Sequence, residues 1–136
     1  MKAFEGDYTL MRIFIGEDDR CTAGRHKGKP LYRALLEMLR EHGCAGASVM
    51  QGIAGFGASA RIHTGKILRL SMDLPIIVEV VDENAKIQEV LPLMDKMIGG
   101  GLVTLEKAHV VLYRADSDPE AFQPSGSSAA SDGPAE

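Results

Sequence analysis

A glycine-rich stretch, residues 52–65 (GIAGFGASARIHTG), has the composition that best suits binding chemistry in this sequence. It holds four glycines and one aromatic residue, Phe56. Glycine lets backbone N–H groups approach an anion closely, so such a stretch can bind phosphate. The spacing does not match the phosphate-loop pattern GxxxxGK[ST], because Ala58 and Ser59 follow Gly57. Two interpretations therefore stay open, a purely structural bend and an anion-binding loop.

Basic side chains follow these glycines closely. Four basic or potentially basic groups occur within nine residues: Arg61, His63, Lys66 and Arg69. They suit contact with an anion or with an acidic surface of a partner, and ordinary surface charge is the alternative. A second basic run, Arg25–Lys29 (RHKGK), is interpreted as a solvated loop.

The sequence supports metal binding and catalysis less than it supports anion binding. The four histidines lack the i,i+4 spacing and the neighbouring cysteines of a zinc site, so no metal ligand is predicted. The acidic run Glu17–Asp19 could hold a cation or form a solvated face, and a metal site shared between subunits stays open. No serine or cysteine has a base close to it in the sequence, so no catalytic residue is predicted and we do not expect an enzyme.

The C-terminal part differs in composition from the rest. Residues 115–136 are rich in Ser, Gly and Pro and contain five Asp and Glu but no Lys or Arg, so we expect a disordered acidic tail. Without these five charges the formal charge changes from -4 to +1 (15 Lys and Arg against 14 Asp and Glu). A nearly neutral domain lacks the basic face that nucleic-acid binding needs. Residues 1–114 are expected to form one domain.

The expected location is the cytoplasm. Cys21 and Cys44 form no CxxC pair and are interpreted as reduced thiols. No signal segment is recognisable at the N-terminus, and no apolar run approaches the roughly 18 residues that a membrane span needs.

Hydrophobic periodicity predicts six elements. Strands are expected at residues 10–15, 47–53 and 75–81, and a last strand or pair of strands at 102–104 with 109–114. Helices are expected from Pro30 to Gly43 and from an N-cap at Asp82 to Ile98. The order strand, helix, strand, strand, helix, strand is that of the ferredoxin-like α+β fold, in which two helices cover one face of an antiparallel sheet.

The strands at 10–15 and 75–81 carry apolar residues on both faces. The face without helices should be polar if it meets water. A homo-oligomer that packs these faces together is therefore expected.

The sequence resembles the PII-like family catalogued as domain of unknown function number 190, which is distantly similar to the PII signalling proteins. The resemblance covers residues 8–114 and is carried by GED (16–18), KPLYRALLEMLREHGCAGASV (29–49), GIAGFG (52–57), HTGKILRLSMDLPIIVEVVD (63–82) and GLVT (101–104). It implies a trimer of ferredoxin-like subunits, with ligand clefts between neighbours and a long loop, residues 54–70, that contacts a target.

The resemblance also implies a ligand site. Gly55, Phe56 and Gly57 match the GFG at the base of the PII loop, where adenine nucleotides bind. Ile98, Gly99 and Gly101 match the IGxG of a short loop that contacts phosphate. Arg114 is the remaining basic residue after the last strand, displaced by one residue from the PII pattern.

Departures from the PII pattern restrict the ligand. Ala58, Ser59, Ala60 and Arg61 replace the Arg-Gln-Lys-Gly that follows GFG in PII, so the residues tied to 2-oxoglutarate are absent. Leu102 replaces a phosphate-binding Lys, so full charge compensation for ATP does not follow. The loop has no tyrosine to modify.

Two functions are consistent with the sequence. The first is a signalling homotrimer, without enzymatic activity, that binds a small anionic ligand such as an adenine nucleotide and controls a partner. The resemblance suggests a membrane transporter or channel as that partner, because members of the family accompany a fluoride-exporting channel. The alternative is a trimeric metal-binding or stress-tolerance protein in which His63 or the run Glu17–Asp19 holds a cation.

Overall fold

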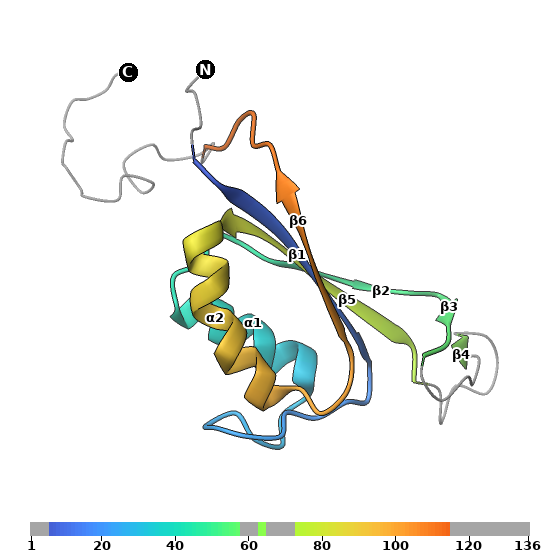
Figure 1. The fold of residues 1–136 in the computed structure, drawn as a ribbon. Helices are drawn as coiled ribbons and strands as arrows, with labels where there is room; N and C mark the ends of the chain where they lie inside the picture. Colours follow the sequence, from blue (N-terminus) through green and yellow to red (C-terminus); the bar gives the residue numbers. More distant parts are fainter. Residues whose placement is uncertain (1–5, 58–62, 65–72, 115–136) are drawn as a thin grey trace. The chain divides into compact units, whose positions relative to one another are not determined.

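The computed structural model describes residues 6–57, 63–64 and 73–114 (Figure 1). The predictions for Arg61, Lys66 and Arg69 lie outside the described residues. Contacts divide the chain into two units, Gly6–Ala108 and a second unit whose described residues are 109–114.

The first unit contains every described helix and strand. The strands are β1 (Tyr8–Gly16), β2 (Ser48–Gln51), β3 (Ala54–Gly55), β4 (His63–Thr64), β5 (Pro75–Glu83) and β6 (Leu102–Ala108). The helices are α1 (Leu31–Glu41) and α2 (Asn84–Met97). Neither described helix is long and apolar enough to cross a lipid bilayer.

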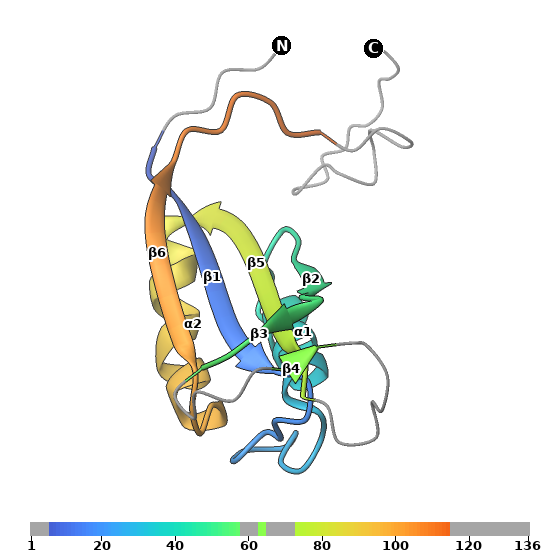
Figure 2. The same ribbon diagram turned by 90° about the vertical axis from the view of Figure 1, so that its right-hand side faces the viewer.

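Four strands form an antiparallel sheet in the order β2-β5-β1-β6, and both helices lie on the same face of it (Figures 1 and 2). The predicted ferredoxin-like order is confirmed. β3 and β4 pair in a separate two-stranded ribbon beyond the end of β2 (Figure 1).

The core lies between the helices and the sheet. In β1 alternate residues are buried, because side chains along a strand point to opposite faces. Met11 and Ile13 of β1 contribute to this core together with Val78 of β5, and each is fully buried. Leu35 of α1 and Ile87 of α2 cover them from the helix side, so the helical periodicity in the sequence identified the buried stripes correctly.

The face without helices is half-exposed in the single chain. The strand registers place Met50, Ile77, Phe14 and Leu102 in one row across all four strands. The two ends of this row, Met50 and Leu102, are 42% and 57% exposed. An apolar row of this kind is typical of a surface that another molecule covers.

Two predictions about element ends are wrong. Residues 109–114 are not a strand: β6 ends at Ala108, the partner of Tyr8 at the start of β1. Asp82 does not cap α2, because β5 continues through it and its carboxylate accepts bonds from the N–H groups of Ala45 and Glu83 (both 2.8 Å).

Candidate functional site

The glycine loop, Ile98–Gly101, joins α2 to β6. Ile98 ends the helix, and its N–H donates to Met94 O (3.0 Å). Gly101 has a φ of +155°, and a Cβ added there would lie 2.8 Å from the backbone oxygen of Phe14. The fold therefore requires glycine at 101 whether or not a ligand binds.

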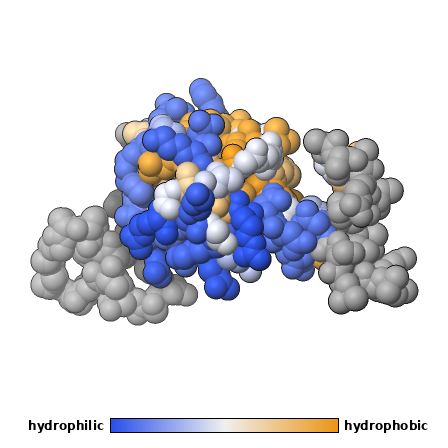
Figure 3. Space-filling view, turned by 90° about the horizontal axis from the view of Figure 1, so that it is seen from below, coloured by the Kyte–Doolittle hydropathy of each residue, from blue (hydrophilic) through white to orange (hydrophobic). Residues whose placement is uncertain are grey.

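The backbone N–H groups of Gly99, Gly100 and Gly101 donate to no acceptor among the described residues. They lie beside a groove of about 430 Å³, which is lined by Leu91, Met94, Asp95, Val103 and the glycine loop itself. Free amides can bind an anion. The one charged side chain among these lining residues is Asp95, so a strongly charged anion would need positive charge from elsewhere. The view from this end of the molecule shows a mostly polar surface with apolar residues gathered on one side (Figure 3).

The second predicted segment, Gly55–Gly57, lies at the start of the long loop. A Cβ added to the preceding glycine, Gly52, would lie 2.7 Å from Pro75 Cγ, and the Gly52 N–H donates to Pro75 O (2.7 Å). Gly57 has no heavy atom within 4 Å of the corresponding position. Packing against β5 thus explains why residue 52 is a glycine, whereas no close contact requires a glycine at position 57.

Phe56 matches the GFG at the base of the PII loop, and this resemblance predicts that its ring anchors the base of the loop here. Its side chain is 70% exposed in the single chain, and Ile53 nearby is 86% exposed. Anchoring of Phe56 therefore needs another molecule and remains a prediction. His63 pairs with Gly55 through the backbone in the ribbon of β3 and β4.

The two predicted halves of the site lie toward the same end of the sheet. Gly52 is next to Pro75 at the start of β5, and Gly101 is next to Phe14 near the end of β1. Among the described residues, no hydrogen bond joins Gly55–Gly57 to Ile98–Gly101.

Arg114 belongs to the second unit, where it is exposed and outside any regular element. Its role as a ligand residue remains a prediction.

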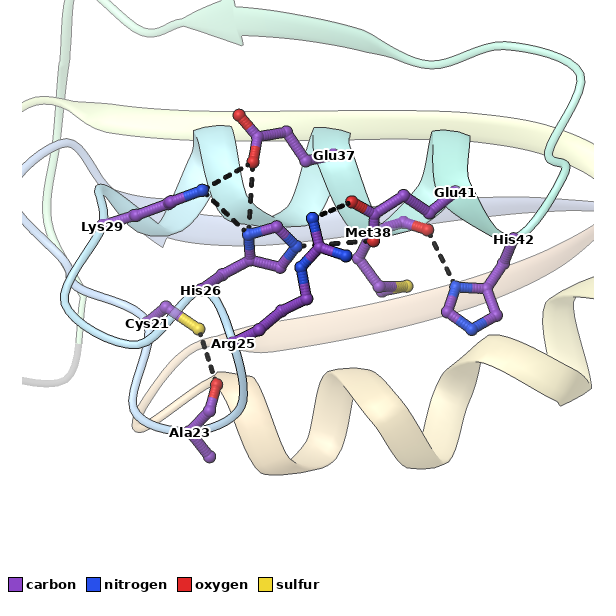
Figure 4. A network of polar contacts seen from close by, with 9 residues as sticks. All are labelled: Cys21, Ala23, Arg25, His26, Lys29, Glu37, Met38, Glu41 and His42. Atoms are coloured by element: carbon purple, nitrogen blue, oxygen red, sulfur yellow. Dashed lines mark hydrogen bonds and ion pairs between the residues drawn. The ribbon is translucent and has the colours of Figure 1, made fainter.

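In the basic run Arg25–Lys29, Arg25, Lys27 and Lys29 are exposed, as expected for a solvated loop, whereas His26 is buried against α1 (Figure 4). His26 is buried, with Nδ1 3.2 Å from Glu37 and Nε2 3.4 Å from Glu41. Lys29 Nζ lies 3.0 Å from Glu37 Oε1 and 3.1 Å from His26 Nδ1, and Arg25 pairs with Glu41 (3.2 Å). The hydrogen bond from Lys29 holds the pKa of Glu37 below its ordinary value. Arg25 and Lys29 are therefore already paired within the chain.

The acidic run supports backbone turns. Asp19 accepts a bond from the Gly16 N–H (2.9 Å), and Asp73 accepts one from the Asp18 N–H (2.8 Å). Within residues 6–57, 63–64 and 73–114, no group of three or more His, Cys, Asp or Glu is arranged to hold a metal ion.

A larger groove, about 620 Å³, lies between α1 and residues 44–47 and contains none of the predicted site residues. Cys44 lines it as a free thiol. Burial, with a smaller contribution from Asp82, raises the pKa of this thiol, which disfavours the reactive thiolate.

Comparison with known proteins identifies the family. The profile of the family described as "DUF190: Uncharacterized ACR, COG1993" matches residues 8–110. The chain belongs to the DUF190 family. The match includes both glycine segments of the DUF190 protein and stops before Arg114, and it confirms the resemblance that the sequence motifs indicated.

Relatives of this DUF190 chain occur in bacteria and archaea. A "UPF0166 protein" of Aquifex aeolicus (strain VF5) is 40% identical over 102 residues, which cover 75% of this chain and 91% of that protein. A "UPF0166 protein" of Methanocaldococcus jannaschii is 32% identical over 102 residues, covering 74% and 89%. Among solved structures, that of CPII bound to ADP and bicarbonate, from Thiomonas intermedia K12, aligns with a TM-score of 0.46 and 14% identity, over 78% of this chain and 90% of that chain.

Sequence reasoning missed three residues of this DUF190 protein: Asp95, which lines the groove, Thr22, which lies beside Gly99, and His26, which is buried in the same loop as Thr22. Asp95 had a usable signal, since it lies one helical turn before the glycine loop. Thr22 and His26 lie in an irregular loop, where periodicity indicates nothing about contacts.

Proposed function

We propose that this DUF190 protein is a regulatory protein of the PII type, without enzymatic activity, that works as a homotrimer. Each cleft between copies binds a small anion, with an adenine nucleotide as the first candidate. The observation that carries the proposal is the set of unused amides at Gly99, Gly100 and Gly101 beside an open groove.

Two further observations support a site between copies. The predicted halves, Gly55–Gly57 and Ile98–Gly101, are joined by no hydrogen bond among the described residues, so a neighbouring copy could complete either one. The exposed ring of Phe56 offers a stacking surface for a base, which a neighbouring copy would complete. Because Asp95 lines the groove, we expect AMP or ADP to bind more tightly than ATP.

Titration calorimetry of the full chain with AMP, ADP, ATP and cyclic AMP tests the ligand. The variant Gly100→Asp places a carboxylate among the free amides, at a position with no heavy atom within 4 Å. We expect it to weaken nucleotide binding about tenfold or more. Gly46→Asp is the matched control, since that glycine is equally open and lies outside the glycine loop. No heat and no thermal shift with any of the four nucleotides would refute the nucleotide proposal.

The loop at residues 54–70 is the proposed contact for a target, and a membrane transporter or channel is the candidate. Bound ligand would bias this loop between two arrangements, one of which binds the target. Replacing Arg61, Lys66 and Arg69 with alanine should abolish binding to a channel reconstituted in liposomes and leave nucleotide affinity unchanged. Retention of channel binding by this triple variant would exclude the loop as the contact.

A further inference from the structure

The loop Cys21–Lys29, called the strap below, is closed by its own backbone bonds. The Cys21 N–H donates to Lys29 O and the Gly28 N–H donates to Cys21 O (both 2.9 Å). Cys21 itself is buried in the core. The strap is therefore a single compact unit rather than a free connection between β1 and α1.

One side of the strap holds the last turn of α2. The Thr22 hydroxyl donates to Lys96 O (2.7 Å), and the Thr22 N–H donates to Met97 O (3.0 Å). The last carbonyls of a helix have no partner within the helix, so these bonds satisfy groups that would otherwise bind water. Thr22 Cγ2 also lies 3.3 Å from the position that a Cβ on Gly99 would occupy. Thr22 therefore lies beside Gly99, the first glycine of the loop.

The other side of the strap is bound to α1. His26 is buried between Lys29 of the strap and the carboxylates of Glu37 and Glu41, and Arg25 adds a second contact to Glu41 (Figure 4). The strap therefore joins α1 to the C-terminal end of α2.

We infer that Thr22 is a positioning residue for the ligand site. It fixes the direction in which α2 ends, and so the orientation of the free amides of Gly99–Gly101, while His26 keeps the strap in place on α1. The inference rests on the proposed anion site at these amides. It assigns to the strap a role in ligand affinity that none of the sequence motifs indicated.

The test compares three threonine variants of the full chain. Thr22→Val removes the hydroxyl but keeps the methyl group over Gly99, and Thr22→Ser keeps the hydroxyl. Thr9→Val is the matched control, because Thr9 donates a similar bond (2.9 Å) to Asn84 at the opposite end of α2. The readouts are ADP affinity by calorimetry, and NMR order parameters of the Gly99–Gly101 amides without any nucleotide.

We expect Thr22→Val to weaken ADP binding about fivefold, the equivalent of one neutral hydrogen bond, and to lower the order parameters of the three amides. Thr22→Ser should stay within about twofold of the wild type. Thr9→Val should lower the melting temperature without changing either readout.

Unchanged ADP affinity and order parameters in Thr22→Val would overturn the inference, and so would an equal loss of affinity in Thr9→Val. If the wild type binds no ADP, the proposed function fails separately. The order parameters then decide the strap inference: a fall in Thr22→Val alone supports it, and no change refutes it.

Discussion

At the residue scale, the glycines of the candidate site divide into two kinds. Gly52 and Gly101 have atoms of Pro75 and Phe14 where a side chain would begin. Gly57 and Gly100 have no heavy atom within 4 Å of that position. The first pair is needed for packing, whereas the second pair leaves room for a ligand.

This division predicts that replacing a glycine of the first kind with alanine lowers stability more than replacing one of the second kind. Gly101→Ala should lower the free energy of unfolding by about 1–3 kcal/mol, because it combines a positive φ with a Cβ 2.8 Å from Phe14 O. Gly100→Ala should change it by less than about 0.5 kcal/mol. Urea denaturation of both variants measures the difference, and equal stabilities would contradict the close approach at Gly101.

Arg12 is a second residue whose surroundings decide what its substitution changes. It lies on the sheet face without helices, with Nε 2.8 Å from Glu79 and Nη1 3.7 Å from Glu106. Its side chain is 35% exposed in the single chain. Exposed ion pairs stabilise a fold little, but two carboxylates left unpaired inside an interface are costly.

Arg12→Gln should therefore weaken self-association about tenfold and leave monomer stability nearly unchanged. Sedimentation equilibrium measures the association, and urea denaturation at low protein concentration measures the stability. Arg33→Gln, on the exposed face of α1, is the control. Normal association of Arg12→Gln would show that this face stays open.

At the element scale, ion pairs join the strap to α1. Lys29 donates to Glu37 (3.0 Å) and lowers the pKa of that carboxyl. A carboxyl whose pKa is lower in the folded than in the unfolded protein contributes stability above its unfolded pKa. That contribution is lost as the pH falls through the folded pKa.

Lys29→Gln should therefore have a lower melting temperature than the wild type at neutral pH. The difference should shrink as the pH falls below 4.5, the ordinary glutamate value, because protonated Glu37 no longer favours the lysine. Thermal unfolding between pH 3 and pH 7 measures this, with Lys27→Gln as control. A difference that is independent of pH would mean that the pair contributes through packing alone.

At the scale of the whole molecule, the apolar row across the open sheet face is the surface proposed to join copies. Met50 begins this row on the edge strand β2 and is 42% exposed. Apolar surface removed from water contributes about 25 cal/mol per Å², so a charge placed in this row opposes association.

Met50→Lys should weaken trimer formation about tenfold or more, as measured by light scattering over a range of concentrations. Val111→Lys is the control, since Val111 is 59% exposed and outside the sheet. A wild-type chain that is monomeric at micromolar concentration would refute the proposed trimer before any variant is compared.

The order of the elements and the family could be predicted because their signals are local. Apolar residues repeat with the periods of strands and helices along β1, α1, β5 and α2, and those periods identified the buried faces. The same signal was wrong for His109–Arg114, which is rich in strand formers. A strand also needs a partner, and Gly6 and Asp7, the described residues before Tyr8, do not pair with β6.

By itself, the sequence determined the ferredoxin-like order, the family and the positions of the glycines. Only the tertiary structure decided which glycines are required by packing, that His26 is buried, and that Thr22 binds the end of α2 beside Gly99. The physical reason is distance along the chain. The neighbours of Gly101 lie in β1, and Thr22 binds the end of α2, so these contacts arise from how the chain packs and leave no periodic trace in the sequence.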